Sequence, residues 1–446
     1  MDGVSPVLLR KIVYAGSNNP SFGRAAHDLR VLAEVTVAVK QVERWTKRIG
    51  QERHEERDAA TAAWLERPLM QREEPPSDVA VASLAVVEMD GGRLQIRSPW
   101  AEKDEGSSAA EQGIAAGVTS PTAAEPSPTA AESSPTAARD AAKRATTGQH
   151  WREDKVGCLM TMSSDVYLVD PCPQIPAVFV DPLQSLKLAQ QIGHAAVPSG
   201  APFAKAQAEG EQTSAEDNAP GPGRPEIVSR RVLASRKDVD AFGPMLAATA
   251  CSLGLFAAER RAFVADGSSE NWSVFKRYFS RWTPVLDFLH CLTYVYKAAM
   301  ADRSYGEGWP VYQRWIGWVW GGEVERVIEE LSLRAAELGE ATASDEEGSA
   351  RKVVAETLTY LRNHRDKMRY DAYRRQGLPL MSSHVESTIK QINYRVKGTE
   401  KFWSEAGAEA LLALRADYLS DEDELEDFWQ RRQATATGQR RYRRSA

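Results

Sequence analysis

The sequence predicts an α/β fold in which a mixed sheet is flanked by helices. Four short segments are rich in apolar and β-branched residues and are bounded by turn residues, as strands are: 79–89, 155–162, 261–265 and 283–288. The segments between and after them carry helical periodicity, and this alternation fits a mixed sheet with helices on its faces. Two of the four predicted strands are followed directly by an aspartate and a glycine, at Asp90 and Asp266.

The first 75 residues are predicted to be helical. One helical segment begins after Ser21 and continues to about residue 35, with apolar residues at helical spacing. We expect Thr36 to cap a second helix. That helix would turn four apolar side chains inward: Val39, Val42, Trp45 and Ile49. Its outer face would present four polar side chains: Lys40, Gln41, Arg44 and Lys47. Such a face is typical of the DNA-recognition helix of a helix-turn-helix, and equally of a helical hairpin with a solvated basic face.

Two segments are predicted to be disordered insertions. In the first, 101–148, the pentapeptide Ser-Pro-Thr-Ala-Ala recurs at positions 120, 127 and 134, and proline every seven residues excludes a coiled coil. The second, 198–225, is rich in Gly, Ala, Pro and acidic residues. The core domain, predicted at 76–300, would therefore assemble its sheet across long loops.

The rest of the chain is predicted to consist of a helical insertion at 301–368, a final core segment at 369–430 and a basic tail at 431–446. The aromatic run 309–320 opens the insertion and would either stack on unpaired bases at a cleaved DNA end or fill the insertion's own core. The core alternative is favoured because Trp315 and Trp318 share a helical face. The arginines of the tail would add nonspecific affinity for phosphate.

Composition narrows the class of protein. A chain of 446 residues, 42% hydrophobic and 26% charged, is long enough for roughly two to four units with a sizeable core. Its net charge of −6 argues against a protein coated with nucleic acid, so any DNA contacts would be local. Its four cysteines form no Cys-x-x-Cys pair, which disfavours a zinc finger and favours reduced thiols. The most apolar helical segment, 245–258, is too short to span a membrane. We therefore expect a cytoplasmic protein without a membrane span.

The segment 361–401 has a positive net charge, opposite to that of the whole chain, because it holds ten Lys and Arg against four Asp and Glu. A local excess of cations is what binding to a phosphate backbone requires. Four side chains of this segment are predicted to bind DNA: Lys390, Arg395, Lys397 and Lys401. One carboxylate, Glu386, stands at the start of the amphipathic helix predicted here. It is either a metal ligand beside a polyanion or the second member of a capping box that begins at Ser383.

Asp90, Asp266 and Glu386 together indicate metal chemistry. Taken singly, each aspartate fits a turn, and Asp90-Gly-Gly before Arg-Leu-Gln-Ile-Arg fits a hairpin. Two acids at strand ends and one at a helix start nevertheless form the ligand set that a two-metal phosphoryl-transfer site requires. A further pair, Asp287 and His290, lies three residues apart where a helix should begin, so both can face the same side. The alternative for this pair is an N-cap aspartate beside a packed histidine.

These residues resemble the site residues of a known family. Asp90, Asp266, the motif Asp287-Phe-Leu-His290 and the late Glu386 are similar to those of bacterial insertion-sequence transposases of the acidic-triad (DDE) type. The resemblance extends over about residues 76–430.

The final segment carries the most specific part of this resemblance. Arg369-Tyr-Asp-Ala-Tyr-Arg-Arg-Gln-Gly-Leu-Pro-Leu before the glutamate, and Arg395-Val-Lys-Gly-Thr-Glu-Lys-Phe-Trp after it, resemble the Kra-type group of these elements. Where many relatives have a Gly-Ser-Gly turn before the glutamate, this chain has Met381-Ser-Ser-His.

The resemblance implies an RNase H-like core that cleaves insertion-element ends and joins them to target DNA. Two Mg²⁺ or Mn²⁺ ions would be held by Asp90, Asp266 and Glu386, with Asp287 and His290 as an accessory pair. It also implies a homo-oligomer assembled on DNA in the bacterial cytoplasm, associated with the nucleoid. Two alternatives stay open: a noncatalytic DNA-binding protein derived from such an enzyme, and a helical scaffold without a nucleic-acid role.

Overall fold

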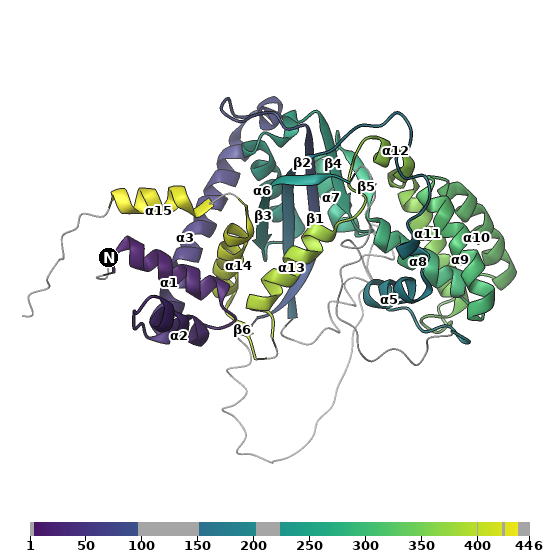
Figure 1. The fold of residues 1–446 in the computed structure, drawn as a ribbon, viewed down its shortest axis with the longest axis horizontal. Coiled ribbons are helices and arrows are strands. Elements are labelled where there is room, and N and C mark those ends of the chain that lie inside the picture. Colours follow the sequence, from purple (N-terminus) through teal and green to yellow (C-terminus); the bar gives the residue numbers. More distant parts are fainter. Residues whose placement is uncertain (1–3, 97–150, 202–223, 399, 422–423, 436–446) are drawn as a thin grey trace, which may run out of the picture.

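The structure is a computed structural model that describes residues 4–96, 151–201, 224–398, 400–421 and 424–435. The predicted disordered insertions, 101–148 and most of 198–225, lie outside the described residues, as does the tail beyond residue 435. The helices of the N-terminal region stand at one end of the molecule, the sheet in the middle and a group of helices at the other end (Figure 1).

Within the described residues, six strands form one mixed sheet. The strands are β1 Leu84–Ile96, β2 Trp151–Ser163, β3 Glu226–Ser235, β4 Arg260–Ala265, β5 Thr283–Leu286 and β6 Phe402–Trp403. Their order is β3-β2-β1-β4-β5, and β6 pairs with the end of β1. β2 is antiparallel to both of its neighbours, whereas β1, β4 and β5 are parallel. The predicted α/β fold with a mixed sheet is therefore confirmed.

Helices precede, interrupt and follow the strands. They are α1 Pro6–Asn18, α2 Phe22–Leu32, α3 Val39–Glu66, α5 Pro182–Gly193, α6 Val239–Ser252, α7 Ser269–Tyr278, α8 Phe288–Met300, α9 Tyr305–Trp320, α10 Val324–Leu338, α11 Ala350–His364, α12 Tyr370–Arg375, α13 Ser383–Val396, α14 Glu405–Leu419 and α15 Glu424–Ala434, with short 3-10 helices η1 Leu69–Glu73, η4 Ala177–Phe179, η5 Leu255–Ala257 and η6 Arg365–Lys367. None of the helices in the described part of the chain has the length and hydropathy needed to cross a membrane.

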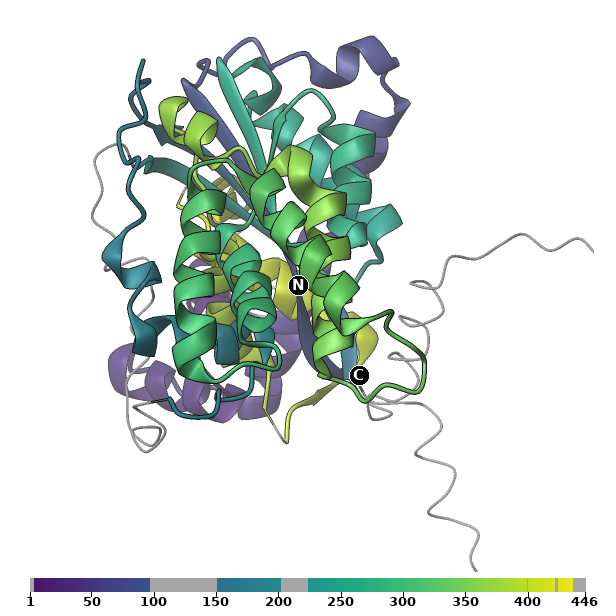
Figure 2. The same ribbon diagram turned by 90° about the vertical axis from the view of Figure 1, so that its right-hand side faces the viewer.

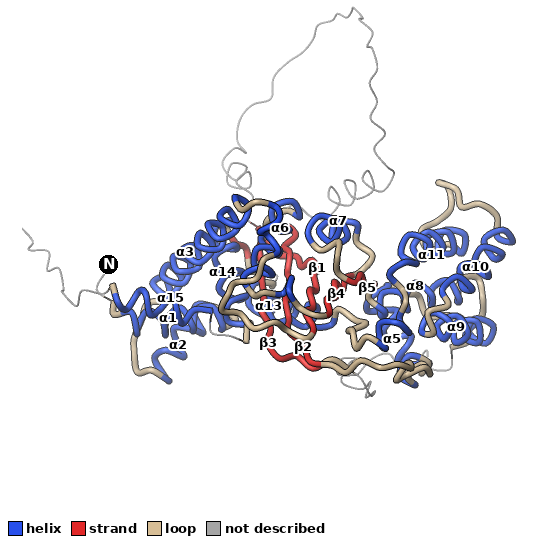
Figure 3. Tube along the Cα trace, turned by 90° about the horizontal axis from the view of Figure 1, so that it is seen from above, coloured by secondary structure: helices blue, strands red, loops and turns tan. Residues whose placement is uncertain are grey.

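Helices cover both faces of the sheet. Successive residues of a strand point to opposite faces, and two neighbours on β2 identify the two layers. A Cβ at Gly157 would lie 2.6 Å from Leu246 of α6, whereas the thiol of Cys158 donates to the Thr388 hydroxyl of α13 at 3.3 Å. α6 and α13 therefore cover opposite faces, with α14 packed beside α13 against β3 (Figure 3).

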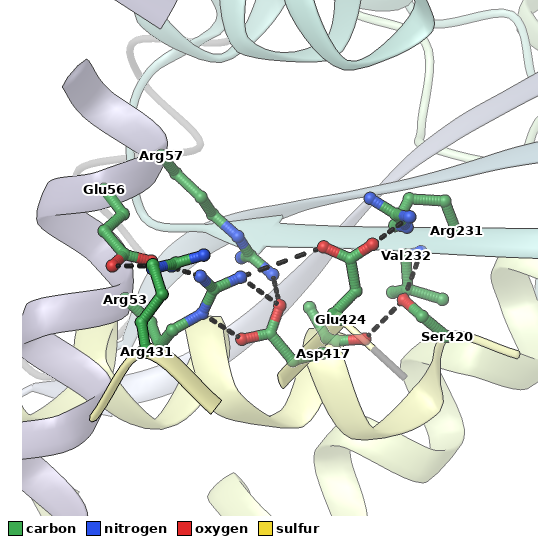
Figure 4. Close-up of polar contacts among 10 residues, drawn as sticks. Arg53, Glu56, Arg57, Arg231, Val232, Asp417, Ser420, Glu424 and Arg431 are labelled. Carbon is green, nitrogen blue, oxygen red and sulfur yellow. Dashed lines mark hydrogen bonds and ion pairs between the residues drawn. The ribbon is translucent and has the colours of Figure 1, made fainter. Parts of the chain in front are cut away.

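The N-terminal helices are attached to the core by buried charge. α3 packs along α14, and the carboxylate of Asp417 on α14 accepts from Arg53 of α3 at 3.0 Å and also from Arg57 (Figure 4). Arg53 also lies 3.8 Å from Glu424 of α15, whose carboxylate pairs with Arg231 of β3. α3 is thus packed against the C-terminal helices α14 and α15.

The predicted helical insertion corresponds to α9, α10 and α11, which pack beside α8 and α5 (Figure 2). Trp315 is buried, and its indole N–H donates to Glu330 at 2.6 Å. Trp318 is half-buried under the guanidinium of Arg326, 4.1 Å from the ring centroid. The expectation that this aromatic run fills the insertion's own core is confirmed for Trp315.

Several local expectations were wrong. The segment after Asp90 is not the second strand of a hairpin, because β1 continues to Ile96 and pairs with β2 along its whole length. The sheet begins at Leu84 rather than at residue 79. In the N-terminal region, α3 begins at Val39, and its N-cap is Ala38 instead of the predicted Thr36.

Other differences concern exposure and missed elements. Val39 is exposed rather than turned inward. Arg431 and Arg432, assigned to a basic tail, lie on α15 and pair with Glu56 and Glu52 of α3. β3 was not predicted at all, because Arg230 and Arg231 interrupt its run of apolar residues.

Candidate metal and phosphate site

The register of the parallel strands brings three aspartates to one edge of the sheet. Glu88 of β1 pairs with Val264 of β4, and continuing this register by two residues on each strand sets Asp90 beside Asp266. Ala265 pairs with the last residue of β5, and one further residue on each strand sets Asp266 beside Asp287. Carboxyl ends of parallel strands meet at one edge, so three separated positions of the chain share one site.

Asp90 reaches this edge in a different way from that predicted. It is not at the end of its strand but inside β1, opposite Val156 of β2. It lies beyond Glu88, the last residue of β1 that pairs with β4, so β4 is not hydrogen-bonded to β1 as a strand at Asp90. Its own carboxylate accepts from the backbone N–H of Gly91 at 2.7 Å.

Asp266 directly follows β4, as predicted, and its side chain is held from several directions. Its carboxylate accepts from the backbone N–H of Ser268 at 2.9 Å and from the side-chain amide of Asn271 at 2.8 Å. The same amide donates to the backbone carbonyl of Met89 at 3.2 Å. Asn271 is buried and therefore links the strand of Asp90 to the turn of Asp266.

Asp287 is fully buried, and its two oxygens are occupied. One accepts from the backbone N–H of His290 at 3.0 Å, which makes Asp287 the N-cap of α8. The other accepts from both the backbone N–H and the hydroxyl of Ser382, each at 2.6 Å. The predicted N-cap alternative is confirmed, and the same carboxylate joins the start of α8 to the start of α13.

Glu386 lies in the first turn of α13, and the predicted capping box is absent. The N-cap of this helix is Ser382 rather than Ser383, and the Ser382 side chain does not accept a hydrogen bond from the first turn. The carboxylate of Glu88 instead accepts from the backbone N–H of Val385 at 2.8 Å. Glu88 is fully buried on β1, two residues before Asp90, so it fixes the start of α13 over that strand.

Two acids of the site, Asp90 and Glu386, have raised pKa values. Burial, with repulsion from Asp266, raises the pKa of Asp90 to about 6. Burial, with repulsion from Asp287, raises the pKa of Glu386 to about 7. Each raised pKa indicates that the protein compensates the negative charge of that carboxylate poorly.

Asp287 and His290 form a charge pair inside the site. Burial opposes both charges, but donors from His290 and Ser382 lower the pKa of Asp287 to about 2. Burial likewise lowers the pKa of His290, and the neighbouring Asp287 outweighs it and raises that pKa to about 9. The ring nitrogen Nδ1 of His290 lies 3.4 Å from the Asp287 carboxylate. The raised pKa favours the protonated imidazole of His290 at neutral pH.

Ligand atoms of three residues already lie close together. Among the described residues, one group of acidic and histidine side chains has donor atoms all within 4.8 Å of one another: Asp287, His290 and Glu386. Asp90 and Asp266 do not belong to this group. Within the described residues, the close group therefore joins Glu386 to the predicted accessory pair, and it does not join the three predicted metal ligands to one another.

Of the eight side chains predicted to bind DNA, four are exposed and four are partly or fully buried. Four of them are exposed: Lys40, Arg44, Lys390 and Lys397. Gln41 is half-buried on α3. Lys47 pairs with Glu43 at 2.5 Å and stacks over Trp403 at 5.8 Å. Lys401 donates to the backbone carbonyls of Tyr394 and Arg395, both at 3.1 Å, at the end of α13.

Arg395 was wrongly assigned to the DNA surface. It is 1% exposed, and its Nε donates to the carbonyl of Gly16 at 3.0 Å. Its guanidinium lies over the rings of Phe22 and Trp403, at 4.5 and 5.2 Å from their centroids. Burial, with repulsion from Arg415, lowers its pKa to about 10. The residue joins α13 to the N-terminal helices.

Three residues that position the site were missed by sequence reasoning: Glu88, Asn271 and Ser382. Of these three, Glu88 could have been recognised from the sequence. It is the single charged residue of the predicted apolar strand 79–89, and such a residue is rarely buried without a specific partner. The other two lie in polar segments that have no distinguishing pattern.

No protein-family model matches the chain, and the comparison with curated proteins gives no match. A proposal about its function therefore rests on the residues and geometry described above.

Proposed function

We propose that the chain is a DNA transposase of the acidic-triad type, with an RNase H-like core. The observation that carries the proposal is the register of β1, β4 and β5, which aligns Asp90, Asp266 and Asp287 at the edge over which Glu386 lies. The strand order β3-β2-β1-β4-β5, with β2 antiparallel to both neighbours, supports the RNase H-like core.

The donor set fits divalent cations. Carboxylate oxygens are the ligands that Mg²⁺ and Mn²⁺ prefer, and the raised pKa values of Asp90 and Glu386 report negative charge that a cation would neutralise. Asp90, Asp266 and Glu386 would hold the ions. When bound, two such ions supply an activated attacking oxygen and stabilise the leaving one.

The protein's own groups would hold the DNA beside that site. His290, kept protonated by Asp287, offers a positive charge to a phosphate at neutral pH. Lys390 and Lys397 are exposed on or directly after α13, the helix that carries Glu386, and would contact the DNA backbone. Both carboxylate oxygens of Asp287 accept hydrogen bonds, one from His290 and the other from Ser382. The role of Asp287 is therefore to position the starts of α8 and α13.

Cleavage of DNA tests the proposal directly. Purified full chain is incubated with supercoiled plasmid and Mn²⁺, and nicking is followed on gels. We expect metal-dependent nicking that falls by roughly a hundredfold or more in Glu386→Gln, while affinity for duplex DNA is retained. The matched control is Glu347→Gln, since the side chain of Glu347 is 84% exposed on the helical insertion. Nicking that needs no metal, or that survives in Glu386→Gln, would overturn the proposal.

The second candidate is a noncatalytic DNA-binding protein descended from such an enzyme. The observation in its favour is that Asp266 is engaged by Ser268 and Asn271, and lies outside the close group formed by Asp287, His290 and Glu386. Binding of duplex DNA by the wild-type chain without any metal-dependent nicking would favour this candidate. The absence of DNA binding at low salt would exclude both.

A further inference from the structure

The C-terminal end of α11 contacts Gly267, which directly follows Asp266, and Trp272, which donates to the backbone carbonyl of Asp266. Gly267, directly after that aspartate, lies against the ring of Tyr360: a Cβ at Gly267 would be 2.3 Å from the Tyr360 ring. One turn later, the ring of His364 lies 6.2 Å from that of Trp272. The indole N–H of Trp272 donates to the backbone carbonyl of Asp266 at 2.7 Å.

Gly267 is a glycine because of this contact and not because of its backbone. It has no positive φ, so any residue could adopt its conformation. A side chain there would meet the edge of the Tyr360 ring at a distance that real atoms do not reach. The ring or the turn would have to move.

Tyr360 itself has little freedom to move. Its ring stacks on Tyr294 of α8 with centroids 3.8 Å apart and 12° between the planes, and His364 meets it edge-on at 4.8 Å. α8 also carries His290 near its start. The buried Tyr360 hydroxyl has no hydrogen-bond partner in the part of the chain that the structure describes, so the ring supplies the contact. The turn after Asp266 therefore rests on a rigid stack.

We propose that the last turn of α11 sets the position of Asp266, with Tyr360 as a positioning residue that acts through Gly267. The helical insertion thereby determines how tightly the acidic site binds its divalent cation. This inference rests on the proposed function, because it assigns to Asp266 the role of a metal ligand.

A double-mutant cycle tests the inference on the full chain, with Mn²⁺ as the probe. The dissociation constant of Mn²⁺ is measured by electron paramagnetic resonance for the wild type, Gly267→Ala, Tyr360→Leu and the double variant. We expect Gly267→Ala to weaken Mn²⁺ binding about tenfold in the wild-type background and less than roughly twofold in the Tyr360→Leu background, since leucine leaves room for the methyl group. Equal losses in the two backgrounds would overturn the inference.

Two controls separate positioning from general damage. Gly317→Ala, in α9, adds a methyl group where no atom lies within 4 Å, and should leave Mn²⁺ affinity unchanged. Tyr360→Phe keeps the ring and should also retain the affinity, whereas a loss there would assign the effect to the hydroxyl and contradict the proposal.

If Gly267→Ala does not fold, Tyr360→Leu alone carries the test: it should lower Mn²⁺ affinity severalfold, and an unchanged affinity would contradict the inference.

The wild-type measurement distinguishes this inference from the proposed function. A wild-type chain that neither binds Mn²⁺ nor nicks DNA overturns the proposed function, and the inference falls with it. A wild-type chain that does both, with no coupling between the two positions, overturns the inference alone.

Discussion

Two clusters of buried charge in this molecule are built in opposite ways. Where α3 meets α14, the buried carboxylate of Asp417 accepts from Arg53 and Arg57, so two cations surround one anion. At the edge of the sheet, Asp90 and Glu386 lie among other acids. The protein neutralises the first cluster by itself and leaves the second with excess negative charge.

The difference separates a stabilising cluster from a candidate site. A buried charge that is paired and hydrogen-bonded holds elements together, and breaking such a pair is costly. Carboxylates that keep raised pKa values cost stability in the absence of a cation and are typical of functional sites. The arginine cluster thus accounts for the attachment of the N-terminal helices, and the acidic cluster for the proposed metal chemistry.

The largest effect is expected at the compensated cluster. Asp417→Ala leaves the buried Arg53 and the half-buried Arg57 without their shared anion, so we expect the free energy of unfolding to fall by about 3–5 kcal/mol. Urea unfolding measures this. Asp421→Ala is the control, because Asp421 is partly exposed and pairs with Arg230 at the surface; its cost should stay below about 1 kcal/mol. A small loss in Asp417→Ala would show that the cluster does not hold α3 in place.

The acidic cluster should make the metal-free protein less stable as the pH rises. A carboxyl with a raised pKa stabilises the fold while protonated, and this contribution is lost as the pH passes its folded pKa, about 6 for Asp90 and about 7 for Glu386. His290, with a pKa raised to about 9, changes stability in the same direction.

We therefore expect the free energy of unfolding, measured in urea with chelator, to fall by on the order of 1–3 kcal/mol for each acid between about pH 5 and pH 8. Mg²⁺ at millimolar concentration should restore it, since a ligand that binds only the folded chain stabilises it. Asp90→Asn should reduce the pH dependence. Stability that rises with pH over this range would contradict the unbalanced charge assigned to the cluster.

Ser382→Ala extends the comparison to the inside of the site, where hydrogen-bond donors from His290 and Ser382 compensate the buried charge of Asp287. The variant removes the hydroxyl that donates to Asp287 at 2.6 Å, so we expect a loss of about 1–2 kcal/mol in stability and a higher pKa of Asp287. Urea unfolding measures the loss of stability, and the chemical shift of the Asp287 carboxyl carbon, followed by NMR against pH, measures its pKa. The control is Ser387→Ala, since Ser387 is exposed on the same helix. Equal effects of the two variants would remove Ser382 from its positioning role.

The smallest effects are expected at the exposed cations. Lys390→Ala and Lys397→Ala should each lower the slope of DNA affinity against salt by about one, because each removes one phosphate contact. Arg395→Ala should leave the slope unchanged and lower stability instead, since that residue is buried against Phe22 and Trp403. Salt titrations of DNA binding check all three, and a changed slope in Arg395→Ala would return it to the DNA surface.

Part of the arrangement of the candidate site could be predicted because it depends on local patterns. Apolar runs that end in acids identified Asp266, and the spacing of Asp287 and His290 at a helix start identified the pair. The partners of these residues could not be predicted, because they come from distant parts of the chain. Glu88 meets Val385, and the sequence carries no sign of that pairing.

Two errors have the same physical origin. Asp90-Gly-Gly admits either a turn or a continuous strand, and only the pairing of β1 with β2, across a long insertion, decides between them. Arg395 belongs to a basic helix, and only its contacts with Gly16 and Phe22 at the other end of the chain remove it from the surface. Local charge pattern predicts where cations lie along the chain but not which of them the tertiary structure buries.

The central claim is that Asp90, Asp266 and Glu386 bind divalent cations together. Anomalous diffraction from crystals soaked in Mn²⁺ tests it most directly, because the peaks locate the ions. The account predicts Mn²⁺ peaks at coordination distance from the carboxylates of all three residues. A single peak among Asp287, His290 and Glu386, with none at Asp90 and Asp266, would contradict it, as would the absence of any peak.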